Sequence, residues 1–372
     1  MRFRALGKSQ NSRARSGTIQ LGQRQLPTPA FFLGHPLGLK PEPWREFKVD
    51  SLMVNAFNVA QNGNLDEIWA AGGVHKFLHF SGPLLMDSGG FQFRELRTVD
   101  WDPGFVLEVF HLTRPDIGVV LDHPLDQMVS KAGYERRWEK TLKNTRYMMR
   151  ENGRVPLMPA VHGYDLRGLA RACSDLTQLC RPQCVAIGSL VPLLRCVKRG
   201  EHLANLRSAE FIGEAIRIVR DAFPRAWLHA LGVGGTTTMH TFFSLGVDSV
   251  DSISWRLKAA FGAIQLPGTG DRFVSPRGRR VGLSREDLRK LEVCECPVCD
   301  GRALRQRLRS LDNSRRDTFG RRAIHNAFVF TQEASRFRQV LRRGNELDLV
   351  RPNYKLSSMA LSGQRMARGE TT

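Results

Sequence analysis

The chain alternates short apolar runs with longer segments of mixed polarity. The runs end in polar or glycine-rich residues and lie at 51–57, 83–90, 117–124, 155–163, 184–192, 226–235 and 248–254. Between them, 165–179 and 209–223 repeat apolar residues at the spacing of an amphipathic helix. Short strands that are apolar throughout and alternate with helices are typical of a parallel α/β fold.

The number of these units favours one α/β architecture. About seven or eight units over roughly 260 residues match the size of a (β/α)8 TIM-type barrel. A doubly wound sheet is the alternative. However, no glycine-rich phosphate-binding sequence follows the first strand, which argues against a dinucleotide-binding version of that fold.

The charge of the chain indicates an anionic partner. It has 56 Lys and Arg against 36 Asp and Glu, a net charge of +20, which is typical of nucleic-acid-binding proteins. An acidic membrane surface is the rival partner, but we find no apolar run of membrane-spanning length and no lysine-rich amphipathic helix. The N-terminus, MRFRALGKSQNSRARSG, lacks the apolar core of a secretion signal. We therefore expect a cytoplasmic protein that begins with a flexible basic arm.

Three of the seven cysteines are clustered. Cys294, Cys296 and Cys299 are followed by His325. Three thiolates and one imidazole complete a tetrahedral Zn²⁺ site without an open position, so the sequence predicts a structural zinc. The other four cysteines are expected to be reduced thiols, which fits a reducing compartment.

Arginines are dense on both sides of this cluster. They include Arg277, Arg279, Arg280, Arg302, Arg305, Arg307, Arg309, Arg315, Arg316, Arg321 and Arg322. Such runs are usually solvated faces, but beside a metal-pinned module we expect a phosphate-binding surface, with Arg277, Arg279, Arg280, Arg315 and Arg316 as its contacts. The predicted organisation is an arm (1–27), a barrel (28–275), a zinc-binding subdomain with a closing helix (276–345) and a tail (346–372).

Three of the predicted strands end in aspartate: Asp87, Asp122 and Asp251. Barrel enzymes place their chemistry at the C-terminal ends of strands. Three carboxylates on one rim repel one another, so stability does not explain them, whereas paired carboxylates are how enzymes cleave glycosidic bonds. The alternative is that each aspartate caps the helix that follows it.

These residues together resemble the tRNA-guanine transglycosylase superfamily. The resemblance rests on the DSGGFQ motif that begins at Asp87, the GVG turn that begins at Gly232, the VDS segment around Asp251 and the cysteine–histidine cluster. It extends from about residue 28 to about residue 345. It implies a (β/α)8 barrel with a zinc-binding insertion that exchanges guanine in nucleic acid for a 7-deazaguanine base.

The resemblance also implies roles for individual residues. Asp251 would attack C1′ of the target nucleotide, and Asp87 would act as general acid and base. Asp122 would read the guanine edge, while Phe91 and Leu231 would sandwich the ring. The residues expected to contact the base are Ser88, Phe91, Asp122, His162, Gly163, Gly188, Leu231 and Gly232.

Departures from the family pattern favour one branch of it. Bacterial tRNA enzymes have a glutamine–glycine pair where this chain has His162-Gly163, and a proline–threonine–arginine run where it has SISWRLKAAFG. The archaeal tRNA enzymes carry C-terminal RNA-binding domains, for which we expect no room before Thr372. The chain therefore looks most like the DNA-modifying 7-deazaguanine transglycosylases (DpdA), with 7-cyano-7-deazaguanine as the incoming base.

Several alternatives stay open at this point. A tRNA-guanine transglycosylase is the main alternative function. A non-catalytic nucleic-acid-binding subunit is a second, against which the retained aspartates argue, and a sugar-processing barrel is a third. A homodimer and partner proteins of DNA modification are compatible with the resemblance.

Overall fold

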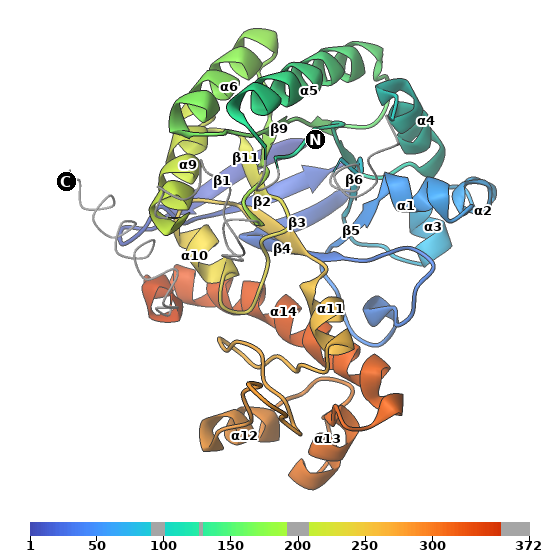
Figure 1. Cartoon of the computed structure of the whole chain (residues 1–372), viewed down its shortest axis with the longest axis vertical. Coiled ribbons are helices and arrows are strands. Elements are labelled where there is room, and N and C mark those ends of the chain that lie inside the picture. Colours follow the sequence, from blue (N-terminus) through green and yellow to red (C-terminus); the bar gives the residue numbers. More distant parts are fainter. Residues whose placement is uncertain (91–100, 126–128, 192–207, 351–372) are drawn as a thin grey trace.

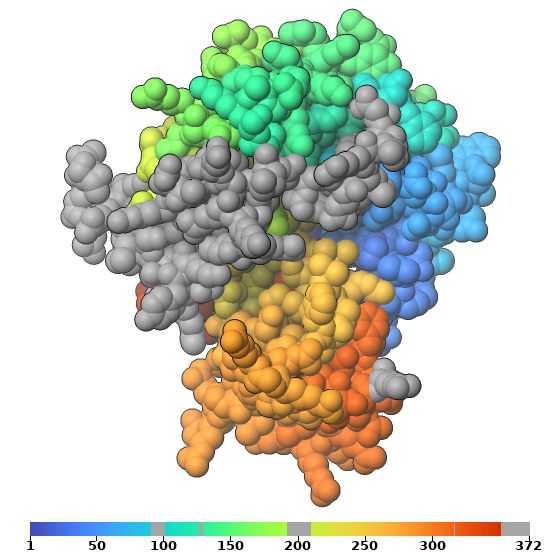
Figure 2. Space-filling model, in the orientation of Figure 1, coloured from blue at the N-terminus to red at the C-terminus, as the bar shows by residue number. Residues whose placement is uncertain are grey.

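The computed structural model describes residues 1–90, 101–125, 129–191 and 208–350. It shows a barrel ringed by helices and a smaller lobe beside it (Figure 1). The smaller lobe projects from the barrel in the space-filling view (Figure 2). No helix among the described residues combines the length and the apolar character needed to cross a membrane.

The barrel is a nine-stranded parallel sheet in the order β8-β7-β6-β5-β4-β12-β11-β10-β9. Its strands are β4 (Ala30–Gly34), β5 (Leu52–Asn55), β6 (Leu84–Asp87), β7 (Ile117–Val119), β8 (Leu157–Met158), β9 (Ala160–Val161), β10 (Cys184–Ile187), β11 (Trp227–Ala230) and β12 (Ser249–Ser252). Only Pro159 separates β8 from β9, the first and last strands of the sheet. They therefore share one strand position, which closes a ring of eight positions and confirms the predicted (β/α)8 barrel.

Helices follow most of the strands and surround the ring (Figure 1). They are α1 (Ala56–Gln61), α2 (Leu65–Ala70), α3 (Val74–Leu78), α4 (Pro103–Thr113), α5 (Lys131–Glu151), α6 (Leu166–Leu179), α9 (Ser208–Ala222), α10 (Met239–Ser244) and α11 (Ser254–Ala260). Helices α6 and α9 confirm the two amphipathic segments predicted from the sequence. Asp165 caps α6 by accepting a hydrogen bond from the Gly168 N–H. Short 3-10 turns lie at Pro43–Arg45, Arg316–Thr318 and Glu346–Leu349.

The N-terminus forms a sheet where the charge pattern suggested a flexible arm. Strands β1 (Arg2–Lys8), β2 (Arg15–Leu21) and β3 (Arg24–Thr28) pair antiparallel and lie across the middle of the helical ring (Figure 1). Ile19, Leu21 and Leu26 are buried in one cluster with barrel-interior residues such as Trp227. The expectation failed because it weighed the arginines and overlooked the buried–half-buried alternation along β2.

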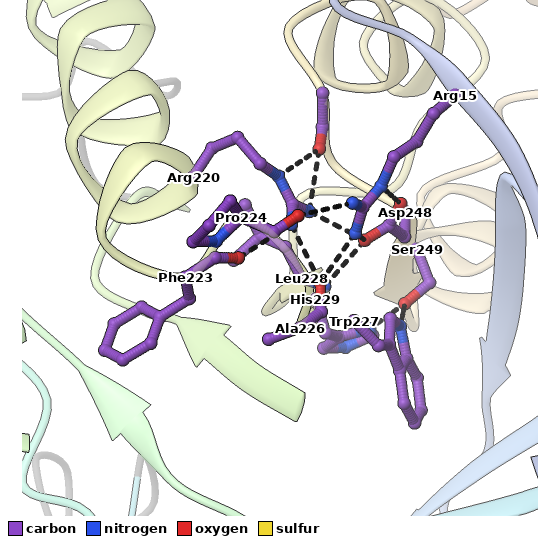
Figure 3. Close-up of polar contacts among 11 residues, drawn as sticks. Arg15, Arg220, Phe223, Pro224, Ala226, Trp227, Leu228, His229, Asp248 and Ser249 are labelled. Atoms are coloured by element: carbon purple, nitrogen blue, oxygen red, sulfur yellow. Dashed lines mark hydrogen bonds and ion pairs between the residues drawn. The ribbon is translucent and has the colours of Figure 1, made fainter. Parts of the chain in front are cut away.

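A buried ion cluster fastens this sheet to the barrel (Figure 3). Arg15 Nε donates to Asp248 Oδ1 at 2.6 Å, and Arg220 Nη2 donates to Asp248 Oδ2 at 2.7 Å. The Leu228 N–H also donates to Oδ2, at 2.8 Å. Asp248 is fully buried just before β12, so the cluster ties β2, α9, β11 and β12 together at the N-terminal end of the barrel.

The smaller lobe contains α12 (Arg285–Glu292), α13 (Leu304–Leu311) and the start of the long α14 (Phe319–Arg342). It has its own apolar cluster, which includes Ile264, Leu291, Leu311 and Ile324. Helix α14 then runs back along the barrel, where Phe330 contacts Phe31 with ring centroids 5.7 Å apart. The predicted closing helix thus belongs to both parts of the molecule.

Candidate active site

A cavity of about 250 Å³ opens at the C-terminal ends of the barrel strands. It gathers most of the predicted site residues from six different strand ends. Those that line it are Asp87, Asp122, His162, Gly188, Leu231, Gly232 and Asp251. Parallel strands end on the same rim, so residues far apart in sequence meet there, as the strand-end pattern predicted.

Asp87 ends β6, and its carboxyl group accepts hydrogen bonds from the Asn55 amide and from the backbone N–H groups of Ser88 and Gly89. Asn55 Nδ2 donates to Asp87 Oδ2 at 2.8 Å. The Asn55 Oδ1 accepts the N–H of Asn58 as the cap of α1, which turns its NH₂ group toward the aspartate. Burial, together with the charges of Asp122 and Asp251, raises the pKa of Asp87 to about 8. At neutral pH this carboxyl group is protonated and can donate a proton.

Asp251 lies within β12 and has one oxygen held by two donors. His229 Nε2 lies 3.1 Å from Asp251 Oδ1, and the Gly232 N–H donates to the same oxygen at 2.7 Å. Among the described residues, no hydrogen bond reaches Oδ2. The carboxylate is therefore fixed in orientation with one oxygen available for attack on an electrophile.

Asp122 follows β7 and is paired with His162. His162 Nε2 lies 2.7 Å from Asp122 Oδ2, and both side chains are buried. The other ring nitrogen of His162 lies 2.9 Å from Ser189 Oγ. Ser189 has a φ of +63°, a left-handed conformation that is uncommon outside glycine and recurs at functional sites.

Glycines allow the backbone to approach these side chains. A Cβ on Gly90 would lie 2.3 Å from Asp122 Oδ1, and one on Gly188 would lie 2.4 Å from His162 Cε1. Any larger residue at either position would displace the carboxylate or the imidazole. Gly89 has a φ of +99°, and a Cβ there would lie 2.6 Å from Phe57 Cβ, so both glycines that follow Asp87-Ser88 have a steric reason.

Three of the predicted base contacts are not found at the cavity. Two do not face it, and the third lies outside the described residues. Ser88 is fully buried, and its hydroxyl donates to the Val120 carbonyl at 3.3 Å. Gly163 faces α6, where a Cβ would lie 2.4 Å from Leu169 Cβ. Phe91 lies outside the described residues. Ser88 and Gly163 therefore pack behind the residues that line the cavity.

Sequence reasoning missed several polar residues in or beside the cavity, among them His35, Asn55, Ser189 and His229. His35 follows β4, lines the cavity and is only 3% exposed. Neither of its ring nitrogens has a hydrogen-bond partner among the described residues, and burial lowers its pKa to about 4. The segment AFFLGHP has the same form as the recognised strands, so its pattern could have identified β4 and His35.

The smaller lobe brings the three cysteines and the histidine together. Their ligand atoms all lie within 4.8 Å of one another. His325 Nδ1 lies 3.3–3.7 Å from the three sulfur atoms, while its Nε2 lies 2.8 Å from the Gln265 carbonyl oxygen. These spacings fit a tetrahedral ion at ordinary metal–sulfur and metal–nitrogen distances.

The arginines of this lobe divide into two groups. Arg277, Arg279 and Arg280 are exposed, whereas Arg307 and Arg322 are buried. Arg307 Nη1 donates to the carbonyls of Leu291 and Cys294, and Arg322 Nε donates to the Ala259 carbonyl. The buried pair supports the backbone and cannot contact phosphates, and neither residue is among the five arginines predicted as phosphate contacts. Arg315 is exposed near Asp317, and the side chain of Arg316 lies outside the described part.

Comparison with known proteins agrees with this geometry. The family model described as queuine tRNA-ribosyltransferase matches residues 10–356. The chain belongs to this family. It is 27% identical to the tRNA-guanine(15) transglycosylases of Pyrococcus abyssi and Methanobrevibacter smithii, over 92% of the chain and 55% and 49% of those proteins. The chain therefore spans about half the length of these two relatives.

Proposed function

We propose that this chain exchanges a guanine of nucleic acid for a free 7-deazaguanine base. One observation carries the proposal: a single cavity contains a carboxyl group that is neutral at pH 7, Asp87, and a carboxylate with one restrained and one available oxygen, Asp251. Proton transfer and nucleophilic attack at a glycosidic bond require this pair.

In the first displacement, Asp251 Oδ2 forms a bond to C1′ of the nucleotide as the C1′–N9 bond to guanine breaks. The electron pair leaves with the guanine, which takes a proton from Asp87. Asp122 accepts hydrogen bonds from the guanine edge while His162 holds its Oδ2.

In the second displacement, the incoming base loses its N9 proton to Asp87 and attacks C1′. The C1′–Oδ2 bond breaks, and its electron pair returns to Asp251 as a carboxylate. Two inversions at C1′ retain the configuration of the nucleotide. Leu231 lies at the cavity wall, where it packs against one face of the base.

The nucleic acid that the comparisons favour is tRNA, because the curated relatives are named tRNA-guanine(15) transglycosylases. This reverses the preference for DNA that the sequence suggested. DNA stays the second candidate because the residues after Asp251, SISWRLKAAFG, replace the run that bacterial enzymes carry there.

Radiolabelled guanine and 7-cyano-7-deazaguanine should be offered with total tRNA, duplex DNA and single-stranded DNA in parallel. We expect label in tRNA with the wild-type chain and none with Asp251→Ala. Label in DNA alone would assign the chain to the DNA-modifying branch. No label in any nucleic acid would overturn the proposed function.

The exposed arginines of the smaller lobe supply a phosphate-binding surface in this proposal. Arg279→Ala with Arg280→Ala should weaken nucleic-acid binding and reduce its salt dependence. The matched control is Arg150→Ala with Arg154→Ala, which removes two exposed charges from the loop at the opposite end of the barrel. Equal affinities for the two double variants at every salt concentration would contradict this assignment.

The Cys₃His group holds a structural zinc in this proposal, because its four ligands leave no open position. Metal analysis should find one zinc per chain, and Cys296→Ser should reduce it. Zinc content that is unchanged in Cys296→Ser and Cys299→Ser would show that the ion binds elsewhere.

A further inference from the structure

The ring of His229 is fully buried inside the barrel, directly behind Asp251. Phe32 contacts it edge-on at a centroid distance of 5.7 Å, and Trp227 does so at 6.2 Å. Both ring nitrogens are nevertheless satisfied: Nδ1 lies 2.7 Å from Ser249 Oγ and Nε2 lies 3.1 Å from Asp251 Oδ1. An imidazole enclosed by aromatic rings cannot change partners without disturbing the core.

The hydrogen-bond chain has only one direction. Trp227 Nε1 can only donate, and it donates to Ser249 Oγ at 2.6 Å (Figure 3). At the other end of the chain, Asp251 Oδ1 is a carboxylate oxygen that can only accept, so His229 Nε2 carries a proton and donates to it. In the neutral ring Nδ1 is then an acceptor, and the Ser249 hydroxyl donates to it.

The same arrangement occurs a second time in the cavity. The Leu125 N–H donates to Ser189 Oγ at 2.8 Å. Asp122 can only accept, so His162 Nε2 carries the proton, and in the neutral ring Nδ1 accepts from the Ser189 hydroxyl. His162 Nε2–H then faces Asp122 Oδ2. Asp122 and Asp251 thus each accept a hydrogen bond from a histidine whose tautomer is fixed by a serine. The repetition indicates that the site requires an N–H donor at each of these carboxylates.

A donor at Asp251 Oδ1 affects the two displacements differently. In the free enzyme Oδ1 belongs to a charged carboxylate, whereas in the covalent intermediate it is the carbonyl oxygen of an ester. A hydrogen bond to a charged acceptor is stronger than one to a neutral acceptor. The donor therefore stabilises the state in which Asp251 has been expelled from C1′.

We propose that His229, fixed by Ser249 and Trp227, is a positioning residue that orients Asp251 and promotes its departure from the covalent intermediate. This inference rests on the proposed transglycosylase function. It assigns a role to a residue that contacts neither the base nor the nucleotide, and it predicts where on the reaction path the loss will fall.

The test is the amount of covalent adduct in three variants. End-labelled tRNA, and single-stranded DNA in a second arm, are incubated with each enzyme at one fixed guanine concentration and resolved on a denaturing gel. Without the donor, in His229→Phe, the ratio of adduct to free enzyme should rise on the order of tenfold. The kcat of exchange and the KM for nucleic acid should fall together, because a slower second displacement lets the covalent intermediate accumulate.

Two further variants separate this role from a general packing defect. His229→Gln can present an N–H near the position of Nε2 and should restore the wild-type adduct ratio. Ser249→Ala keeps the imidazole but removes the hydroxyl that fixes its tautomer. The ratio of adduct to free enzyme should therefore also rise, but by less than in His229→Phe. Ser249→Ala also provides the decisive comparison if His229→Phe does not fold.

The outcomes are distinct. An adduct ratio that is unchanged or lower in His229→Phe, or unchanged in Ser249→Ala, overturns the inference while wild-type exchange leaves the proposed function intact. Wild-type enzyme that labels no nucleic acid overturns the proposed function, and this inference with it. Absence of adduct in Asp251→Ala confirms that the trapped species is the aspartyl ester.

Discussion

The two ends of the barrel present aspartates in opposite surroundings. Asp248, at the N-terminal end of the barrel, accepts hydrogen bonds from two arginines and a backbone N–H and is fully buried. At the C-terminal rim, Asp87 has neutral amide donors and two neighbouring carboxyl groups, and its pKa rises to about 8. One end satisfies its buried charge, whereas the other concentrates charge that it does not compensate.

The difference separates the end that maintains the fold from the rim at which we propose that the chemistry takes place. Paired ions and the apolar residues of the N-terminal sheet close one end of the barrel. The rim keeps groups that cost stability: neighbouring carboxyl groups, and a buried imidazole at His35 without a hydrogen-bond partner among the described residues. Barrels commonly divide stability and activity between their two faces in this way. The predictions that follow are different ways to perturb one face and not the other.

Asp87→Asn should have the largest effect. The amide cannot transfer the proton, so exchange should fall by about 10²- to 10⁴-fold. The folded state binds the Asp87 proton more tightly than the unfolded state between pH 3.8 and about 8, so the stability of the wild type falls as pH rises through that window. The slope is at most about 1.4 kcal/mol per pH unit. Melting curves should therefore show the variant to be more stable than the wild type at pH 9 and similar at pH 4.

Asp248→Ala, at the N-terminal end of the barrel, should destabilise the protein. It leaves Arg15 and Arg220 buried without their counter-ion, which should lower the free energy of unfolding by about 3–5 kcal/mol in denaturant titrations. The control is Asp221→Ala, which removes a half-exposed partner of Arg13 and should cost less than about 1 kcal/mol. Similar losses for the two variants would show that the buried cluster does not fasten the sheet.

The pH dependence of exchange should reflect ionisation at the rim. Burial and the neighbouring carboxyl groups hold the pKa of Asp87 at about 8, so kcat/KM should decline above that pH by about tenfold per unit. The residual activity of Asp87→Asn should not show this decline. A wild-type rate that is flat from pH 7 to pH 10 would exclude Asp87 as the proton donor.

His35→Phe should have the smallest effect. It removes a buried ring whose nitrogens have no hydrogen-bond partner among the described residues, which should raise the free energy of unfolding by about 1 kcal/mol at pH 7. The gain should be larger at pH 5, because the lowered pKa of His35 makes the wild type lose stability as pH falls from 6.5 to about 4. A loss of stability in denaturant at both pH values would show that the ring is held by packing alone.

Local patterns predicted much of the fold and of the site. Apolar runs that end in Asp87, Asp122 and Asp251 identified strand ends, and the spacing of Cys294, Cys296 and Cys299 identified the Cys₃His group. The arm of residues 1–27 was predicted wrongly because its arginines outweighed the alternation of Ile19 and Leu21. The sequence also could not distinguish Arg307 and Arg322, which are buried, from exposed arginines in the same run.

By itself, the sequence determined the elements, because the period of apolar residues sets which backbone conformation can bury them. It also determined the chemical inventory: three strand-end carboxyl groups, a thiolate cluster and an excess of positive charge. Only the tertiary structure decided how these groups act on one another. The pKa of Asp87 depends on its burial and on two aspartates from other strands. The orientation of Asp251 depends on His229, Ser249 and Trp227, whose hydrogen bonds form only when adjacent strands of the closed barrel place them side by side.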